Sequence, residues 1–114
     1  MKDHLIPLVK EMLIEGEDDW VMVDFLIGVA EEFASPRGED FRDVSLELLR
    51  ELLREEVMEI GDLGHTGFEP WPLGVDDSVA RFKEGCESHD WDPMGALWWL
   101  ANTEKGARWL ENIH

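Results

Sequence analysis

Three pairs of closely spaced aspartates are the residues of this chain best suited to acid–base chemistry: Asp18 and Asp19, Asp76 and Asp77, and Asp90 and Asp92. General acid–base catalysis needs two groups held close together in environments that separate their pKa values. Each pair instead stands at a predicted helix start or turn, where a carboxylate caps free backbone N–H groups. The sequence has no Ser/His/Asp order, phosphate-binding loop or HExxH motif. We therefore expect no catalytic residues and no enzyme activity.

Histidines and carboxylates in the second half of the chain offer a second chemistry, metal binding. His65, His89, Asp90 and Asp92 are of types that ligate zinc or manganese. Their spacing matches no established metal site, so we predict neither a metal nor a cofactor. Cys86 is the only cysteine, which excludes an internal disulfide and a thiolate zinc site. Its apolar spacing within a predicted helix favours a small core residue.

Six tryptophans give the chain its strongest candidates for partner binding. Trp98 and Trp99 are adjacent in a predicted strand, so their side chains point to opposite faces. One enters the core, and the other is covered by aromatic residues of the preceding segment (Phe68, Trp71 and Phe82), by a partner or by a second copy. An exposed aromatic side chain inside an acidic rim is typical of a protein-binding hot spot. Trp20 and Trp71 raise the same alternatives.

Acidic residues dominate the composition. The chain of 114 residues carries 27 Asp and Glu against 10 Lys and Arg, a formal net charge of -17. Such a field repels phosphate and attracts basic proteins, although solubility alone is an alternative reason for it. The apolar run from Trp20 to Ala30 is too short to span a bilayer, and the first residues do not resemble a signal peptide. We expect one cytoplasmic domain that does not bind membranes.

Apolar periodicity predicts helices over residues 4–14, 18–34, 41–55 and 104–113. Asp40 or Asp43 is expected to cap the third of these, and Thr103 the last. Short strands are predicted at 57–60 and 96–101. Residues 61–75 are expected to be irregular because they contain four glycines and two prolines, with a short helix after a cap at Asp76–Ser78. In the closing helix, the residues expected to point inward are Ala107, Leu110 and Ile113, with Trp109 as a further candidate.

The order helix–helix–helix–strand–long wing–strand–helix resembles winged-helix regulators of the PadR and MarR kind, over residues 18–112. The matching features are the leucine-rich helix before Val57, the strand exit Glu59–Asp62 and the Asn102–Gly106 motif. The resemblance implies an α+β, mostly helical fold with a three-helix core and a two-stranded wing enlarged by an inserted loop and short helix. Within one domain (1–114), the parts are an N-terminal helix (1–16), the helical core and first strand (18–60), the wing insertion (61–95), and the return strand and C-terminal helix (96–113). The stretch from Gly61 to Gly106 also resembles small bacterial proteins with no assigned activity.

Winged-helix domains mostly bind DNA, and in this chain the recognition helix would be 41–55. Its three arginines, Arg42, Arg50 and Arg54, alternate with four carboxylates. Such a face pairs its charges internally and is poorly suited to neutralising phosphates, which supply most non-specific affinity for DNA. The basic hairpin of the family is also replaced here by the 61–95 insertion. We therefore do not expect nucleic acid to be the main partner.

Our leading prediction is a non-catalytic, acidic protein-binding module, for example an immunity or inhibitor protein that occludes a basic partner such as a nuclease toxin. The residues predicted to contact the partner are Glu17, Asp18, Asp19, Glu47, Glu51, Glu55, Trp71, Trp98 and Trp99. One alternative is a winged-helix transcriptional regulator that binds DNA as a dimer through Arg42, Arg50 and Arg54. Another is a structural or regulatory subunit. A homodimer formed through helices 4–14 and 104–113 is compatible with each of these functions.

Overall fold

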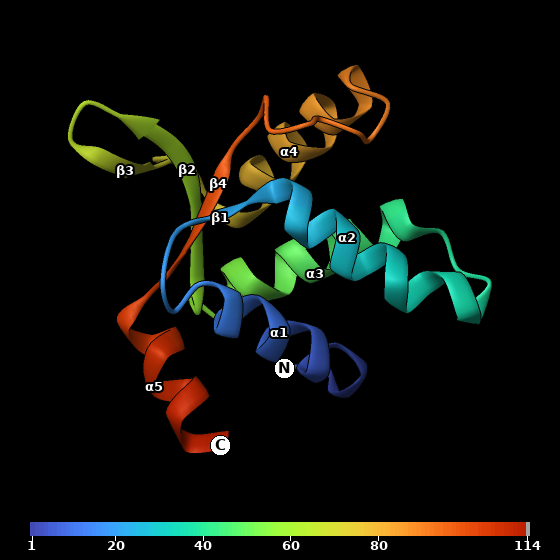
Figure 1. Ribbon diagram of the computed structural model, residues 1–114, viewed down its shortest axis with the longest axis horizontal. Coiled ribbons are helices and arrows are strands. Elements are labelled where there is room, and N and C mark those ends of the chain that lie inside the picture. Colours follow the sequence, from blue (N-terminus) through green and yellow to red (C-terminus); the bar gives the residue numbers. More distant parts are fainter. Residues whose placement is uncertain (114) are drawn as a thin grey trace.

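The computed structural model describes residues 1–113, whose buried apolar side chains form one continuous core. Helices alternate with short strands along the chain (Figure 1). The elements are η1 (Asp3–Leu5), α1 (Ile6–Glu15), β1 (Val21–Met22), α2 (Val23–Ala34), η2 (Ser35–Arg37), α3 (Phe41–Arg54), β2 (Met58–Gly64), β3 (Gly67–Pro70), α4 (Val75–Ser88), β4 (Trp99–Asn102) and α5 (Glu104–Ile113). The prediction of an α+β fold is confirmed.

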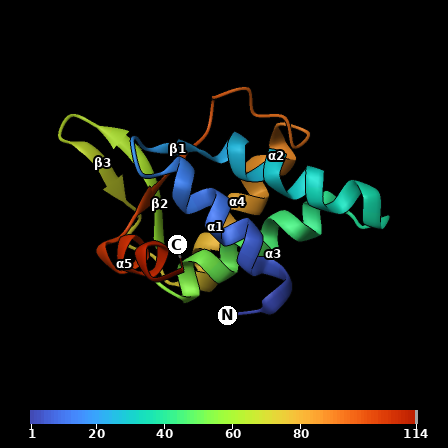
Figure 2. The same cartoon turned by 60° about the horizontal axis from the view of Figure 1, so that its bottom comes forward.

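The strands form one antiparallel sheet in the order β1-β4-β2-β3. Leu100 on β4 pairs with Val21 on one side and Ile60 on the other, and all three side chains are buried. Helices α1 to α4 gather on one side of the sheet, while the β2–β3 hairpin projects away from them (Figures 1 and 2). The two strands expected after α3 and before the last helix are paired, as β2 and β4, but the expectation of a two-stranded wing is wrong because β1 and β3 extend the sheet to four strands.

Helix α3 follows the predicted pattern closely. Leu48, Leu49 and Leu52 are fully buried, as expected for a stripe that faces the core. The side chain of Asp40 accepts a hydrogen bond of 2.9 Å from the backbone N–H of Arg42, so Asp40 and not Asp43 is the N-cap. This cap fixes where α3 begins.

The predicted helix over 18–34 is wrong in its first turn. Residues 21–22 form strand β1, and α2 begins only at Val23. Val21 pairs with Leu100 and Met22 with Trp99, so this stretch completes one edge of the sheet. The apolar pattern of the helix begins already within residues 21–22, so it does not mark where the strand ends. Hydrogen bonding to β4 therefore decides the conformation of these two residues.

The expectation of irregular structure over 61–75 is wrong for residues 61–70, whereas residues 71–74 are irregular as predicted. Strand β2 continues to Gly64, and a two-residue turn at His65 and Thr66 leads into β3. Gly67 has a φ of +104°, which glycine adopts without strain. At Gly61 a Cβ atom would lie 2.2 Å from the backbone oxygen of Glu69, so only glycine allows this approach. The glycines therefore permit the hairpin that their number had argued against.

The last strand and helix are shifted in detail from their predicted forms. Strand β4 spans Trp99–Asn102 and not 96–101. Thr103 does cap α5, because its Oγ1 accepts a 2.9 Å hydrogen bond from the backbone N–H of Gly106. Only Gly106 and Leu110 of α5 are buried. Ala107 and Ile113 are exposed, contrary to prediction, because α5 packs against the rest of the protein only through a narrow face.

The start of α4 also departs from the prediction. Gly74 is its N-cap, so Asp76 and Asp77 lie within the first turn, and no side chain caps the helix. Cys86, on the inner face of α4, is fully buried as expected. Among the helices within residues 1–113, none combines the length and the apolar character needed to cross a bilayer.

Candidate protein-binding surface

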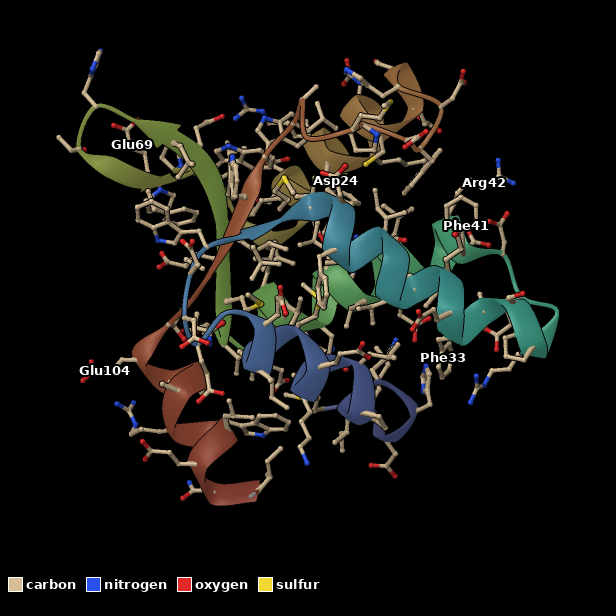
Figure 3. All side chains as sticks on the ribbon, in the orientation of Figure 1. Asp24, Phe33, Phe41, Arg42, Glu69 and Glu104 are labelled. Carbon is tan, nitrogen blue, oxygen red and sulfur yellow. The ribbon has the colours of Figure 1, made fainter. Side chains whose placement is uncertain are left out.

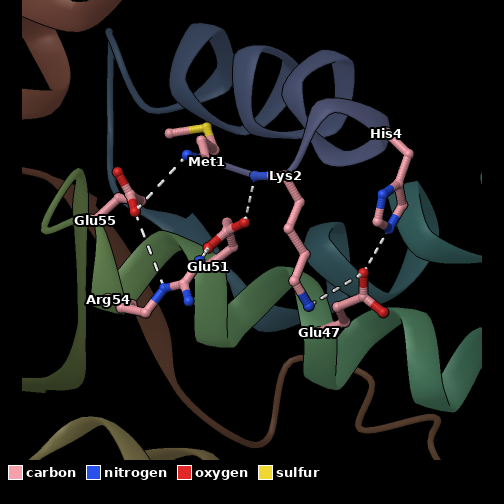
Figure 4. A network of polar contacts seen from close by, with 7 residues as sticks. All are labelled: Met1, Lys2, His4, Glu47, Glu51, Arg54 and Glu55. Atoms are coloured by element: carbon pink, nitrogen blue, oxygen red, sulfur yellow. Dashed lines mark hydrogen bonds and ion pairs between the residues drawn. The ribbon is translucent and has the colours of Figure 1, made fainter.

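The outer face of α3, which carries three of the predicted contact residues, is occupied by contacts within the protein (Figure 4). Glu51 is only 2% exposed. Its carboxylate accepts a 2.7 Å hydrogen bond from the backbone N–H of Lys2 and pairs with Arg54. Burial by itself raises the pKa of Glu51, but the hydrogen bond from Lys2 and the Arg54 guanidinium together outweigh it, so that the pKa is lowered. Glu51 therefore already has partners within the protein, and its predicted contact with another protein stays a prediction.

Glu47 and Glu55 are half-buried and are also engaged in internal contacts. The Nε2 atom of His4 lies 2.5 Å from Glu47, and the Lys2 ammonium lies 3.9 Å from the same carboxylate. Glu55 lies 3.9 Å from the Arg54 guanidinium. These contacts fold the first residues of the chain onto α3, and they leave this face of the helix a poor choice for attracting a partner.

The three arginines proposed for DNA binding are likewise paired. Arg42 forms a two-point contact with Asp40, at 3.0 Å for each nitrogen. The hydrogen bonds from its side chain and backbone hold the pKa of Asp40 below its usual range. Arg50 pairs with Asp76, and Arg54 with Glu51. A phosphate that bound here would therefore have to displace a carboxylate from each guanidinium.

Glu17, Asp18 and Asp19 lie in the loop between α1 and β1, and not at the start of a helix as predicted. All three are exposed, and within residues 1–113 none of their carboxylates forms an ion pair. Asp19 accepts a 2.7 Å hydrogen bond from the backbone N–H of Trp20, which orders the end of the loop. The loop forms one wall of a shallow hollow of about 340 Å³, closed on the other side by Ala101 and Asn102. Three carboxylates are therefore concentrated beside one exposed indole.

Trp20 packs against the β2–β3 hairpin. Its ring stacks on Phe68 with centroids 6.4 Å apart, yet 42% of the residue stays exposed. Leu63, directly opposite Phe68 in the hairpin, is also 42% exposed. Figure 3 shows a further carboxylate, Glu69, on the same hairpin. We call the set Glu17, Asp18, Asp19, Trp20, Leu63 and Phe68 the Trp20 surface.

Sequence reasoning found the acidic part of this surface but missed Leu63 and assigned Phe68 only a covering role. The signal was present in the two glycines at positions 64 and 67, which flank the two-residue turn. A hairpin there places Leu63 and Phe68 side by side on one face. The open edge of β3 is a weaker candidate, since Pro70 has no N–H to offer an incoming strand.

The other predicted tryptophans are largely internal. Trp71 is 7% exposed, and its Nε1 donates a 3.1 Å hydrogen bond to Asp62. It meets Trp98 edge to face at 4.8 Å, and the guanidinium of Arg81 lies 4.3 Å from the Trp71 ring centre. This cluster packs α4 against the sheet, and the predicted contact of Trp71 with a partner stays a prediction.

Trp98 and Trp99 are both half-buried. Trp98 packs against Gly85 of α4, where a Cβ atom would lie 2.2 Å from the indole. Trp99 stands in the row of Met22 and Gly61, on the face opposite to buried Leu100. The two indoles thus point to opposite faces, and Trp99 rather than Trp98 borders the Trp20 side of the sheet.

The histidines, aspartates and cysteine considered for metal binding or catalysis do not come together in one site within residues 1–113. Within residues 1–113, no three side chains of the His, Cys, Asp and Glu types lie close enough to hold one metal ion. Burial raises the pKa of the Cys86 thiol to about 12, with a contribution from the Asp24 and Glu87 carboxylates. That thiol is protonated at neutral pH and is a poor nucleophile.

No family model matches the chain, and neither curated proteins nor solved structures give a match.

Proposed function

We propose that this protein is a non-catalytic module that binds a basic protein through the Trp20 surface. The observation that carries the proposal is the position of Trp20, which is held on Phe68 yet 42% exposed, directly after three carboxylates without ion pairs in residues 1–113. Aromatic anchors that are already ordered lose little entropy on binding, and they dominate the energetics of many interfaces.

Charge supplies the second part of the argument. A net charge of -17 creates a long-range field that speeds encounter with a cationic partner. The carboxylates at positions 17–19 are free to make new ion pairs, whereas those on α3 already have cationic neighbours. An inhibitor or immunity protein that occludes a basic nuclease fits this arrangement, since its carboxylates would compete with phosphates for the same cationic groups.

The proposal is tested by isolating a basic partner at about 50 mM salt, where charge-driven contacts are little screened, and then measuring binding to purified variants. Trp20→Ala should weaken binding at least roughly ten-fold, as expected for a central aromatic anchor. Leu73→Ala is the matched control, because Leu73 is equally exposed but lies in another groove. It should leave affinity unchanged.

The acidic loop is tested by association rates. Asp18→Asn combined with Asp19→Asn should slow association, and raising the salt concentration should reduce the difference. The control, Glu84→Gln with Glu111→Gln, removes the same charge from the exposed faces of α4 and α5. Equal effects of the two pairs would mean that only net charge matters and would remove the loop from the proposal.

A winged-helix regulator is the alternative, and the strand order supports it. Strands β2 and β4 flank an insertion that contains β3 and α4, in the order that the winged-helix resemblance implies. If the protein binds DNA, a 30-base-pair duplex should be shifted in a gel at low salt, and replacing Arg42, Arg50 and Arg54 by alanine should abolish the shift. A shift with the duplex and no binding to a basic protein would favour this alternative.

A further inference from the structure

A second hollow lies between α2, the start of α3 and the segment that joins α4 to β4. Its volume is about 420 Å³. Four carboxylates line it, those of Asp24, Glu31, Asp90 and Asp92, together with the rings of Phe41 and Trp91. No lysine or arginine is among its lining residues. In Figure 3, Asp24 and Phe41 lie along the same side of α2, beneath the segment joining α4 to β4.

The aromatic wall of this hollow is fixed by packing. The Trp91 ring meets Phe41 edge to face at 6.1 Å and Phe82 at 6.0 Å. Phe82 is fully buried, so it anchors the indole to the core. The backbone N–H of Trp91 donates a 2.7 Å hydrogen bond to the carbonyl of Cys86. A ligand would therefore find this wall already formed, which reduces the entropy lost on binding.

The acidic wall is also held in place. Asp24 accepts a 3.0 Å hydrogen bond from the backbone N–H of Gly95, which ties the segment to the start of α2. Asp90 and Trp91 both have positive φ values, +51° and +60°, which non-glycine residues rarely adopt. This turn of the backbone lies at the hollow, which Asp90, Trp91 and Asp92 line together with Asp24 and Glu31 of α2.

The negative charge of this hollow is not neutralised by a lysine or arginine among its lining residues. Arg42 lies 5.9 Å from the Phe41 ring centre, but its guanidinium is paired with Asp40. Lys83 lines a neighbouring hollow that shares Asp90 and Trp91. Carboxylates beside aromatic rings are the combination that a guanidinium binds best, because it is planar, stacks on rings and pairs with carboxylates at two points.

We propose that this hollow binds one arginine side chain of the basic partner. The inference rests on the proposed function for the identity of that partner, but the chemistry of the hollow can be tested without it. The segment that supplies Asp90 and Asp92 to the hollow continues to Gly95, where a Cβ atom would lie 3.6 Å from the sulfur of Met22 in the strand after Trp20.

The probe is ethylguanidinium, titrated into the isotopically labelled protein while backbone and indole NMR signals are followed. We expect saturable changes in the chemical shifts of the NMR signals of Phe41, Trp91 and Asp92. Glu31→Gln combined with Asp92→Asn should lower the affinity for ethylguanidinium roughly five-fold or more. This is the loss expected when two charge contacts beside an aromatic ring are removed. The control pair Glu84→Gln with Glu111→Gln changes the net charge equally, on the exposed faces of α4 and α5, and should leave the affinity within about two-fold.

Three results would overturn the inference: shifts confined to the Trp20 surface, equal weakening by both pairs of substitutions, or ethylammonium binding as tightly as ethylguanidinium. With the partner in hand, Glu31→Gln/Asp92→Asn should also weaken the complex. If the probe binds but no basic protein does, the proposed function fails and the hollow stands. If a basic protein binds and the probe does not, only the inference about the hollow fails.

Discussion

The backbone N–H of Lys2 donates a 2.7 Å hydrogen bond to the carboxylate of Glu51, a residue that is 49 positions away and 2% exposed. Arg54, one turn further along α3, pairs with the other oxygen of the same carboxylate. Glu51 therefore joins the first turn of the chain to the third helix. It is also the one buried acidic side chain of the described residues.

Replacing Glu51 by glutamine should destabilise the protein. The substitution keeps the shape but leaves Arg54 without its buried partner, which should cost about 2–3 kcal/mol in the free energy of unfolding measured by urea denaturation. Glu11→Gln, on the exposed side of α1, is the control. It should be neutral or slightly stabilising because it reduces the excess negative charge, and an equal loss in both variants would contradict the role given to Glu51.

The stabilisation by Glu51 should depend on pH in a defined direction. Its pKa in the folded protein is lowered from the usual value of 4.5, so the unfolded chain binds the proton more readily. The contribution is therefore complete above about pH 4.5 and is lost as the pH falls through the folded-state pKa. The stability difference between the wild type and Glu51→Gln should be largest at pH 7 and should shrink below pH 4.5. Measuring the difference cancels the titration of the other acids.

Close packing against the backbone explains why the Thr103–Gly106 motif ends in glycine. A Cβ atom there would lie 2.1 Å from the carbonyl oxygen of Val57, in the backbone that leads into β2. Gly106→Ala should therefore destabilise the protein by roughly 3 kcal/mol, at the upper end of overpacking effects. Gly28→Ala is the matched control, because nothing lies within 4 Å of that position in α2. It should stabilise the protein by about 0.5–1 kcal/mol through helix propensity.

Cys86 should be unreactive in the folded protein. Its thiol is fully buried, and burial raises its pKa to about 12. At pH 8, labelling by a disulfide reagent should be at least ~100-fold slower than in denaturant, where the thiol returns to its ordinary pKa near 8.5. Rapid labelling of the native protein would indicate that α4 opens readily at its C-terminal end.

Trp20 should dominate the response of the protein to a fluorescence quencher. It is the one tryptophan of the described residues among the exposed large apolar side chains. Acrylamide should therefore quench a fraction of the emission that disappears in Trp20→Phe. Trp71→Phe, which changes a residue that is 7% exposed, should leave the quenchable fraction unchanged. The opposite outcome would place the exposed indole elsewhere and weaken the proposed surface.

Local patterns in the sequence determined those features that depend on near neighbours. The leucine stripe of α3, its cap at Asp40 and the cap of α5 at Thr103 each require only residues within one or two turns. The alternation across Trp98 and Trp99 is likewise a property of extended backbone. These features were predictable because helix period, strand period and capping act over a few residues, whatever the rest of the chain does.

Tertiary structure alone decided which charged and aromatic groups are free. Glu51 and Glu17 look alike in sequence, but Lys2 and Arg54 enclose the first, whereas the loop before β1 leaves the second exposed. Strand β1 exists because β4, nearly eighty residues later, supplies its hydrogen-bond partners. Trp20 became an exposed anchor because the β2–β3 hairpin brings Phe68 beneath it. Such pairings join residues far apart in the chain, and no local pattern specifies them.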